Sequence, residues 1–358
     1  MATASETEIP PSRPLSKSRV DYLDFARGLC FIAVVLGHLS EPAINRFVFT
    51  FHLPVFLIIT GYFINPNTDI ITLIKKKLKS LIIPYYIACF LLTLSSIIIR
   101  VFKDHINIKG ILKLLELYLA ASVYAAGENW NIPFFILGIG AIWFLWASFW
   151  SVMIFWVVKK LPTIPGILIV AALVVAAKYI AEYVFFPPLS ILPGCIAVLY
   201  VYAGYVWRKY FDRLATLKLW IKALLILLSI VVWGEFVINF ESFGLVNCDI
   251  GRGFQDVFAS LCASAVVIGF SFLTEKYAPL ITRPFCFIGK YSIVALTAHI
   301  IEQNTFPWND LINMILGENA SRIGTLLLLL AFKFVWISLF TIVITRFKTT
   351  RKLFALRT

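Results

Sequence analysis

The chain of 358 residues is 60% hydrophobic, and only 14% of its residues are charged. Soluble domains usually carry about 25% charged residues, so this composition excludes an ordinary soluble protein and favours one that is solvated by the lipid bilayer. The net charge of +13 does not indicate nucleic-acid binding. The Lys and Arg residues lie in short clusters between apolar runs, as in the cytoplasmic loops of membrane proteins.

The order of polar and apolar segments predicts the domain organisation. Residues 1–18 are polar and rich in Pro and Ser, which predicts a disordered cytoplasmic tail. A transmembrane domain is expected over 19–345, and a basic cytoplasmic tail over 346–358. A helix crosses about 30 Å of hydrocarbon in about 20 residues. The apolar runs predict ten spans, at 20–40, 47–64, 81–102, 139–158, 164–185, 190–207, 219–239, 255–273, 286–303 and 323–345.

The distribution of basic residues predicts the orientation of these spans. With the N-terminus in the cytoplasm, the inside segments hold roughly three times as many Lys and Arg residues as the outside segments. This bias places both termini inside and requires an even number of spans. Residues 110–125 fit an additional, interfacial amphipathic helix. The fold expected is therefore an all-α, polytopic membrane protein of about ten transmembrane helices.

The first span contains three costly polar residues. Asp24 and Arg27 are three residues apart, so they share a helix face and can pair, although both also fit the cytoplasmic start of a helix. His38 lies eleven residues after Arg27, which is about 16 Å along a helix. An imidazole can accept a proton from a hydroxyl near neutral pH. His38 therefore fits either a general base near the outer leaflet or an interfacial residue at a helix end.

Other polar residues leave two interpretations open. His52 begins the second span, where structural and substrate-binding roles are both reasonable. His299 and Glu302 lie one turn apart in the ninth span, so the carboxylate can orient a reactive imidazole or form a buried structural hydrogen bond. Lys333 lies deep in the tenth span and is expected to face the bundle interior. A basic run follows the second span and suits lipid head groups or the phosphates of coenzyme A; it consists of Lys75, Lys76, Lys77 and Lys79. No spacing of Cys and His resembles a metal site.

Several motifs together resemble the acyltransferase-3 family of membrane O-acyltransferases, and most closely its fucose 4-O-acetylase-like branch. The Arg27-to-His38 spacing is joined by Phe-His-Leu-Pro at 51–54, Thr-Gly-Tyr-Phe at 60–63 and Ile-Ile-Pro-Tyr at 82–85. This N-terminal match covers about residues 19–86. Weaker matches lie at 142–145 and 289–299.

The resemblance implies a reaction and roles for named residues. The donor would be cytoplasmic acetyl-CoA, and the acceptor a hydroxyl of a surface-glycan sugar or its lipid-linked precursor, in a bacterial inner membrane. His38 would be the base, either directly or through an acetyl-His intermediate, and His299 a second acid or base. Arg27 and the basic run would hold coenzyme A. Acceptor-binding candidates are Asp24, His52, Tyr62, Trp143 and Glu302.

A membrane protein with interior charges also fits another class. The alternative is a transporter or flippase of a lipid-linked glycan. Such proteins often contain internal repeats and broken helices, and the sequence shows no repeated halves.

Overall fold

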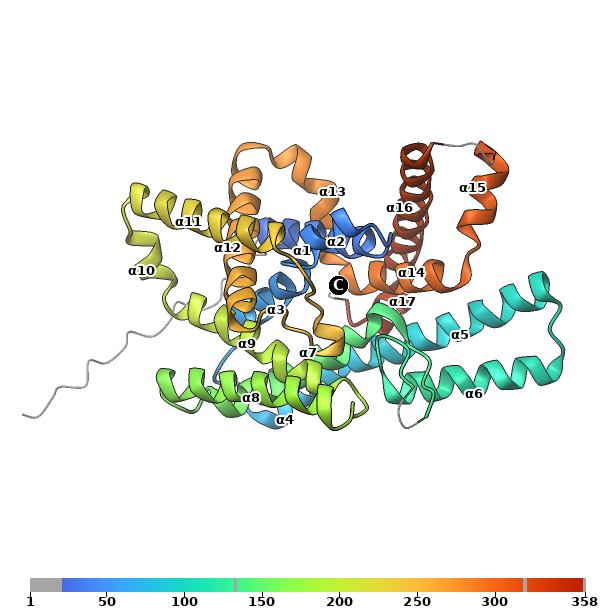
Figure 1. The fold of residues 1–358 in the computed structure, drawn as a ribbon, viewed down its shortest axis with the longest axis horizontal. Helices are drawn as coiled ribbons and strands as arrows, with labels where there is room; N and C mark the ends of the chain where they lie inside the picture. Colours follow the sequence, from blue (N-terminus) through green and yellow to red (C-terminus); the bar gives the residue numbers. More distant parts are fainter. Residues whose placement is uncertain (1–20, 132–133, 318–320, 357–358) are drawn as a thin grey trace, which may run out of the picture.

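The computed structural model describes residues 21–131, 134–317 and 321–356, and the regular structure within them is helical, without strands (Figure 1). The predicted tail over 1–18 lies outside these residues. The longer helices, in chain order, are α1 (Asp21–Gly37), α2 (Pro42–Val48), α3 (His52–Phe63), α4 (Ile70–Lys77), α5 (Ile83–Asp104), α6 (Ile108–Tyr124), α7 (Phe144–Val158), α8 (Thr163–Tyr183), α9 (Ile191–Lys209), α11 (Leu219–Ile238), α12 (Phe254–Tyr277), α13 (Pro279–Lys290), α14 (Ser292–Thr305), α15 (Trp308–Leu316) and α16 (Arg322–Arg346). The short elements are η1 (Leu78–Ile82), η2 (Gly140–Trp143), α10 (Phe211–Thr216), η3 (Leu245–Asn247) and α17 (Lys348–Leu353).

The number of apolar helices agrees with a polytopic membrane protein. Among the described residues, 8 helical segments are long and apolar enough to cross a membrane, and the bent pair α13–α14 raises this number to 9. Helix α1, the match to the first predicted span, has 17 residues, or about 26 Å, and is not among these segments. The predicted all-α membrane architecture is confirmed.

Two predicted boundaries differ from the structure. The third span does not start after the basic run, because α4, the π-helical turn η1 and α5 form one continuous segment, Ile70–Asp104. The four lysines therefore lie on a helix rather than in a loop. The ninth span is not one helix, because the chain bends by 74° between α13 and α14. The bend lets α13 pack on α1 while α14 packs on α16.

The amphipathic segment predicted over 110–125 forms α6. This helix returns along α5, and the two lie side by side (Figure 1). The hydroxyl of Tyr85 on α5 donates a hydrogen bond of 2.9 Å to the carbonyl oxygen of Ser122 on α6. Helix α6 therefore packs against α5 through one face, where Leu114, Tyr118, Ala121 and Ser122 are buried.

Glycines allow close approach between two pairs of helices near the centre. A Cβ atom at Gly61 on α3 would overlap the backbone carbonyl of Val201 on α9, and one at Gly204 on α9 would overlap that of Ile58 on α3. The same relationship joins α1 and α13 at Gly28 and Gly289. Small residues at helix crossings are typical of membrane bundles, where close packing replaces the hydrophobic effect.

The outer helices expose apolar side chains on most sides. On α11, Phe236 is the one buried residue, although the helix is rich in Leu, Ile and Val. On α16, the buried residues are Lys333, Ile337 and Thr341. Helices that are apolar all round but exposed are expected to face lipid. Burial of a lysine on such a helix indicates that it points into the bundle.

Candidate active site

A cavity of about 550 Å³ lies where α1, α2, α3, η2, α7 and α14 meet residues 127–128 and the segment 239–253. Aromatic rings form much of its wall; these are Phe31, Phe49, Phe56, Trp143, Phe144, Phe240 and Phe243. Polar groups are interspersed among the rings; these are His38, Asn45, Arg46, His52, Glu128, Glu241, Ser242, Asn247, Asp249 and Ser292. The combination of aromatic faces and convergent polar groups is typical of a small-molecule site.

The side chain of His38 faces this cavity. It follows the last residue of α1, where its backbone N–H donates to the carbonyl oxygen of Val35 at 3.3 Å. Protein surrounds the ring, yet the residue remains accessible because the cavity opens beside it. Gly37 lets the ring of Phe49 pack against the end of α1, since a Cβ atom there would collide with that ring.

His299 lies directly behind His38. The ring centroids of the two histidines are 5.2 Å apart. Nδ1 of His299 forms a hydrogen bond of 2.7 Å with a carboxylate oxygen of Glu302. Because a carboxylate only accepts, Nδ1 carries the proton, and Nε2 of the neutral ring is then an acceptor. This Nε2 is buried and has no hydrogen-bond partner within the described part of the chain.

Glu302 is the centre of a buried ion pair. Nζ of Lys333 on α16 donates to both carboxylate oxygens, at 2.9 Å and 2.7 Å, and the indole of Trp308 donates to one of them. Glu302 is 0% exposed and does not line the cavity. The structure thus places this residue, predicted to bind substrate, beneath His299, where it orients the ring.

Two further predicted residues line the cavity. His52 is buried at the start of α3, and its Nδ1–H donates to the carbonyl oxygen of Val48 at 2.7 Å. That bond leaves Nε2 of a neutral His52 ring as an acceptor. Trp143 lies in η2 and contributes an aromatic face. The structure therefore brings His38, His52 and Trp143 together, with His299 adjacent.

The remaining predicted residues form a separate group at the other end of α1. Arg27 pairs with Asp24 at 3.6 Å, and its guanidinium lies 5.7 Å from the centroid of the Phe63 ring. The charge of Lys77 is close enough to interact with that of Arg27, whereas Lys75, Lys76 and Lys79 are exposed.

Tyr62 lies with this second group and not at the cavity. Its ring is 4.6 Å from that of Trp207 between centroids, and its carbonyl oxygen accepts a hydrogen bond of 3.1 Å from Arg208. The structure therefore separates Tyr62 from the candidate acceptor site. Arg208 joins Arg27 and Lys77 in a cationic region at the cytoplasmic end predicted from the sequence.

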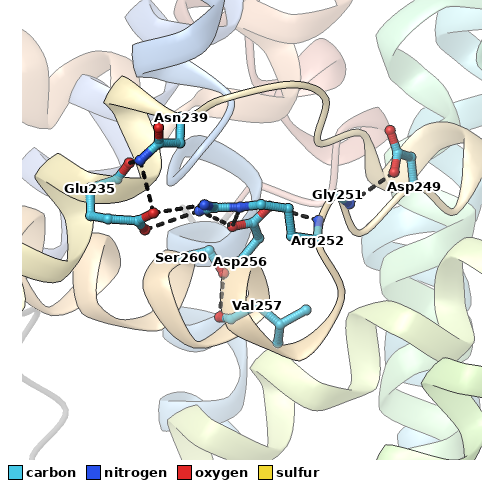
Figure 2. Close-up of polar contacts among 8 residues, drawn as sticks. All are labelled: Glu235, Asn239, Asp249, Gly251, Arg252, Asp256, Val257 and Ser260. Carbon is cyan, nitrogen blue, oxygen red and sulfur yellow. Dashed lines mark hydrogen bonds and ion pairs between the residues drawn. The ribbon is translucent and has the colours of Figure 1, made fainter.

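The segment 239–253 forms a wall of the cavity that the sequence did not single out. Figure 2 shows that Arg252 holds it in place. The guanidinium donates to both oxygens of Glu235 on α11, at 2.7 Å and 3.0 Å, and to Asp256 on α12. Hydrogen bonds to these two carboxylates raise the pKa of Arg252 above its ordinary value. Glu128, which also lines the cavity, has a raised pKa because it is partly desolvated.

The described residues contain no group of three or more His, Cys, Asp or Glu side chains that could hold a metal ion.

Comparison with known proteins identifies the family. The model of an acyltransferase domain, named acyltransferase 3, matches residues 20–346. The chain belongs to this acyltransferase family. No curated protein and no solved structure gives a match. The acyltransferase is thus an integral membrane protein, and its narrower resemblance to the fucose 4-O-acetylase-like branch stays a prediction.

Proposed function

We propose that this acyltransferase moves an acetyl group from cytoplasmic acetyl-CoA to a hydroxyl of a surface-glycan sugar or its lipid-linked precursor, in a bacterial inner membrane. The observation that carries the proposal is the position of His38, which faces a polar and aromatic cavity and has His299 directly behind it. Such a site suits a base that acts on a bound hydroxyl.

The shape of the cavity supports a donor and an acceptor that arrive from opposite sides. Its wall includes Glu241 and Asp249, in a segment predicted to lie outside. It also includes Ser292, two residues after Lys290, which is predicted to lie inside. The lining therefore includes segments near both predicted sides, and the Arg27 region lies outside the cavity at the other end of α1.

The cationic region around Arg27 suits the phosphates of coenzyme A. Arginine binds phosphate with a planar pair of donors and stays charged. Arg27 lies about 16 Å along the helix from His38, and an extended pantetheine arm spans that distance. The nucleotide would stay near Arg27 and Lys77 while the thioester reaches the cavity.

Transfer then needs one proton to move twice. A ring nitrogen of His38 accepts the hydroxyl proton of the acceptor as its oxygen attacks the thioester carbonyl carbon. The carbon–sulfur bond breaks, and the departing thiolate takes the proton from the imidazolium. His38 returns to its neutral form, while the carboxylate of Glu302 keeps the ring of His299 oriented beside it.

The proposal is tested with purified protein in detergent and acetyl-CoA labelled in its acetyl group. Release of free coenzyme A thiol together with label in a sugar acceptor supports it. A protein that binds lipid-linked glycan without cleaving the thioester would instead be a transporter. Deletion of the gene should remove an acetyl group from the glycans of the host, as measured by mass spectrometry.

A further inference from the structure

The segment 239–253 supplies more of the cavity wall than any other loop. Its contribution includes Phe240, Glu241, Ser242, Phe243, Asn247 and Asp249. An isolated backbone bridge between Gly244 and Asp249 closes the segment into a compact turn. This segment lines the same cavity as His38 at the end of α1 and His52 on α3, so it borders the space that a molecule bound beside His38 would occupy.

A set of interlocking hydrogen bonds fixes the base of this wall. Arg252 donates through its side chain to Glu235 and Asp256, and its backbone N–H donates to Asp256 at 2.8 Å (Figure 2). Gly251 has a φ of +54° and lies so close to the Asp256 carboxylate that a Cβ atom would collide with it. The side chain of Asp249 accepts from the N–H of Gly251 at 2.8 Å.

The network ties three parts of the chain together. Glu235 lies on α11, Asp256 on α12 and Arg252 between them, and the side chain of Asp256 is only 2% exposed. Arg252 does not line the cavity. It therefore acts on the cavity only through the segment that it holds, which makes it a positioning residue.

The charges that line the cavity are mostly negative. Glu128, Glu241 and Asp249 carry carboxylates, and Arg46 is the cation among the described lining residues. The two histidines of the lining, His38 and His52, are the remaining titratable groups. Carboxylates accept hydrogen bonds from hydroxyls, and aromatic faces pack against the apolar face of a sugar ring. The carboxylates of the lining would repel a ligand that carries a carboxylate or a phosphate into this space.

We propose that the 239–253 wall is the acceptor subsite, that it selects a hydroxyl-rich head group without negative charge, and that Arg252 positions this wall. The inference rests on the proposed acyl transfer for its kinetic test, but its binding test does not. A phosphate of a lipid-linked acceptor would accordingly lie outside the cavity while the neutral sugar enters it.

The binding test compares two probes that differ in one group. Equilibrium dialysis in detergent uses labelled octyl β-glucoside and octyl β-glucuronide, both below their micellar concentrations. Wild-type protein should bind the glucoside at least about tenfold more tightly than the glucuronide. Glu241→Gln, at an exposed position, should reduce that difference. Lys103→Gln, which breaks an exposed ion pair with Asp310, serves as the control and should leave the ratio unchanged.

The kinetic test separates positioning from general stability. Arg252→Gln should raise the KM for the glucoside about tenfold while the KM for acetyl-CoA stays constant. Glu235→Gln keeps the contact between Arg252 and the buried Asp256, and it serves as the test if Arg252→Gln fails to accumulate. It should raise the KM for the glucoside by a smaller factor and leave the KM for acetyl-CoA constant. A loss of thermal stability with both KM values unchanged would contradict the positioning role.

The two proposals fail in different ways. Equal binding of the glucoside and the glucuronide, or binding of neither, would overturn the inference even if acetyl transfer occurs. Preferential binding of the glucoside without any thioester cleavage would support the inference and contradict the proposed function.

Discussion

The rings of His38 and His299 lie with their centroids 5.2 Å apart, although they come from opposite ends of the chain. His299 is fully buried and held by Glu302, whereas His38 is the ring that a bound molecule can reach. The pair therefore divides two tasks. In the proposed mechanism His38 meets the substrate, and His299 supports it from behind.

Replacement of His299 tests this division. His299→Gln should lower kcat about 10- to 100-fold, because the oriented imidazole that packs beside His38 would be lost, while the KM values for both substrates change little. Steady-state kinetics with acetyl-CoA and an acceptor measure the split. A KM increase with unchanged kcat would instead make His299 a substrate-binding residue.

The ion pair between Lys333 and Glu302 should matter more for stability than an exposed pair. Lys333→Met leaves a buried carboxylate without its cation, which is expected to cost about 3–5 kcal/mol. Adding Glu302→Gln should recover much of that stability but not activity, since His299 still lacks its anion. Thermal unfolding in detergent measures the first effect and kcat the second.

The matched control for this pair is Lys103 with Asp310, whose side chains are 51% and 68% exposed. Lys103→Gln should change stability by at most about 1 kcal/mol. If Lys333→Met costs no more than this control, the buried pair does not stabilise the bundle.

The cationic region at the start of α1 should determine donor affinity. Arg27→Gln combined with Lys77→Gln should raise the KM for acetyl-CoA at least about tenfold, since charged hydrogen bonds to phosphate contribute about 1.5–3 kcal/mol each. The acceptor KM should stay constant. Lys348→Gln, on the exposed helix α17, is the control. An unchanged donor KM in the double variant would exclude this region as the coenzyme A site.

Close packing of α3 on α9 should tolerate no added side chain. Gly204→Val would place atoms against the backbone of Ile58 and should destabilise the protein by about 1–3 kcal/mol. Gly234→Val on α11 is the control, because a Cβ atom there has nothing within 4 Å. Equal unfolding temperatures for the two variants would show that the crossing can open without cost.

Features that depend on local spacing could be predicted from the sequence. Residues 299 and 302 share a helix face at any position in a fold, so the His299–Glu302 contact follows from their separation. The interior position of Lys333 follows from the cost of exposing its charge to lipid. The apolar run lengths were enough to predict an all-α membrane bundle.

Features that depend on distant segments could not be predicted in the same way. The partner of Lys333 lies on a different helix, and nothing in the spacing selects Glu302. The bend at Tyr291 and the helical continuation through the basic run reflect packing against α1 and α7, which leaves no local signal. The role of Arg252 was missed because its two carboxylates and the cavity converge only in the folded chain.

Replacement of His38 tests whether its ring is the base for acyl transfer. Purified wild-type protein and His38→Asn are compared for acceptor-dependent release of coenzyme A thiol from acetyl-CoA. His105→Asn is the matched control, because His105 is exposed at the end of α5 in a left-handed conformation that Asn tolerates. The rate of thiol release should fall at least about 100-fold for His38→Asn and stay unchanged for His105→Asn. Wild-type turnover by a correctly inserted His38→Asn protein would contradict this role of His38.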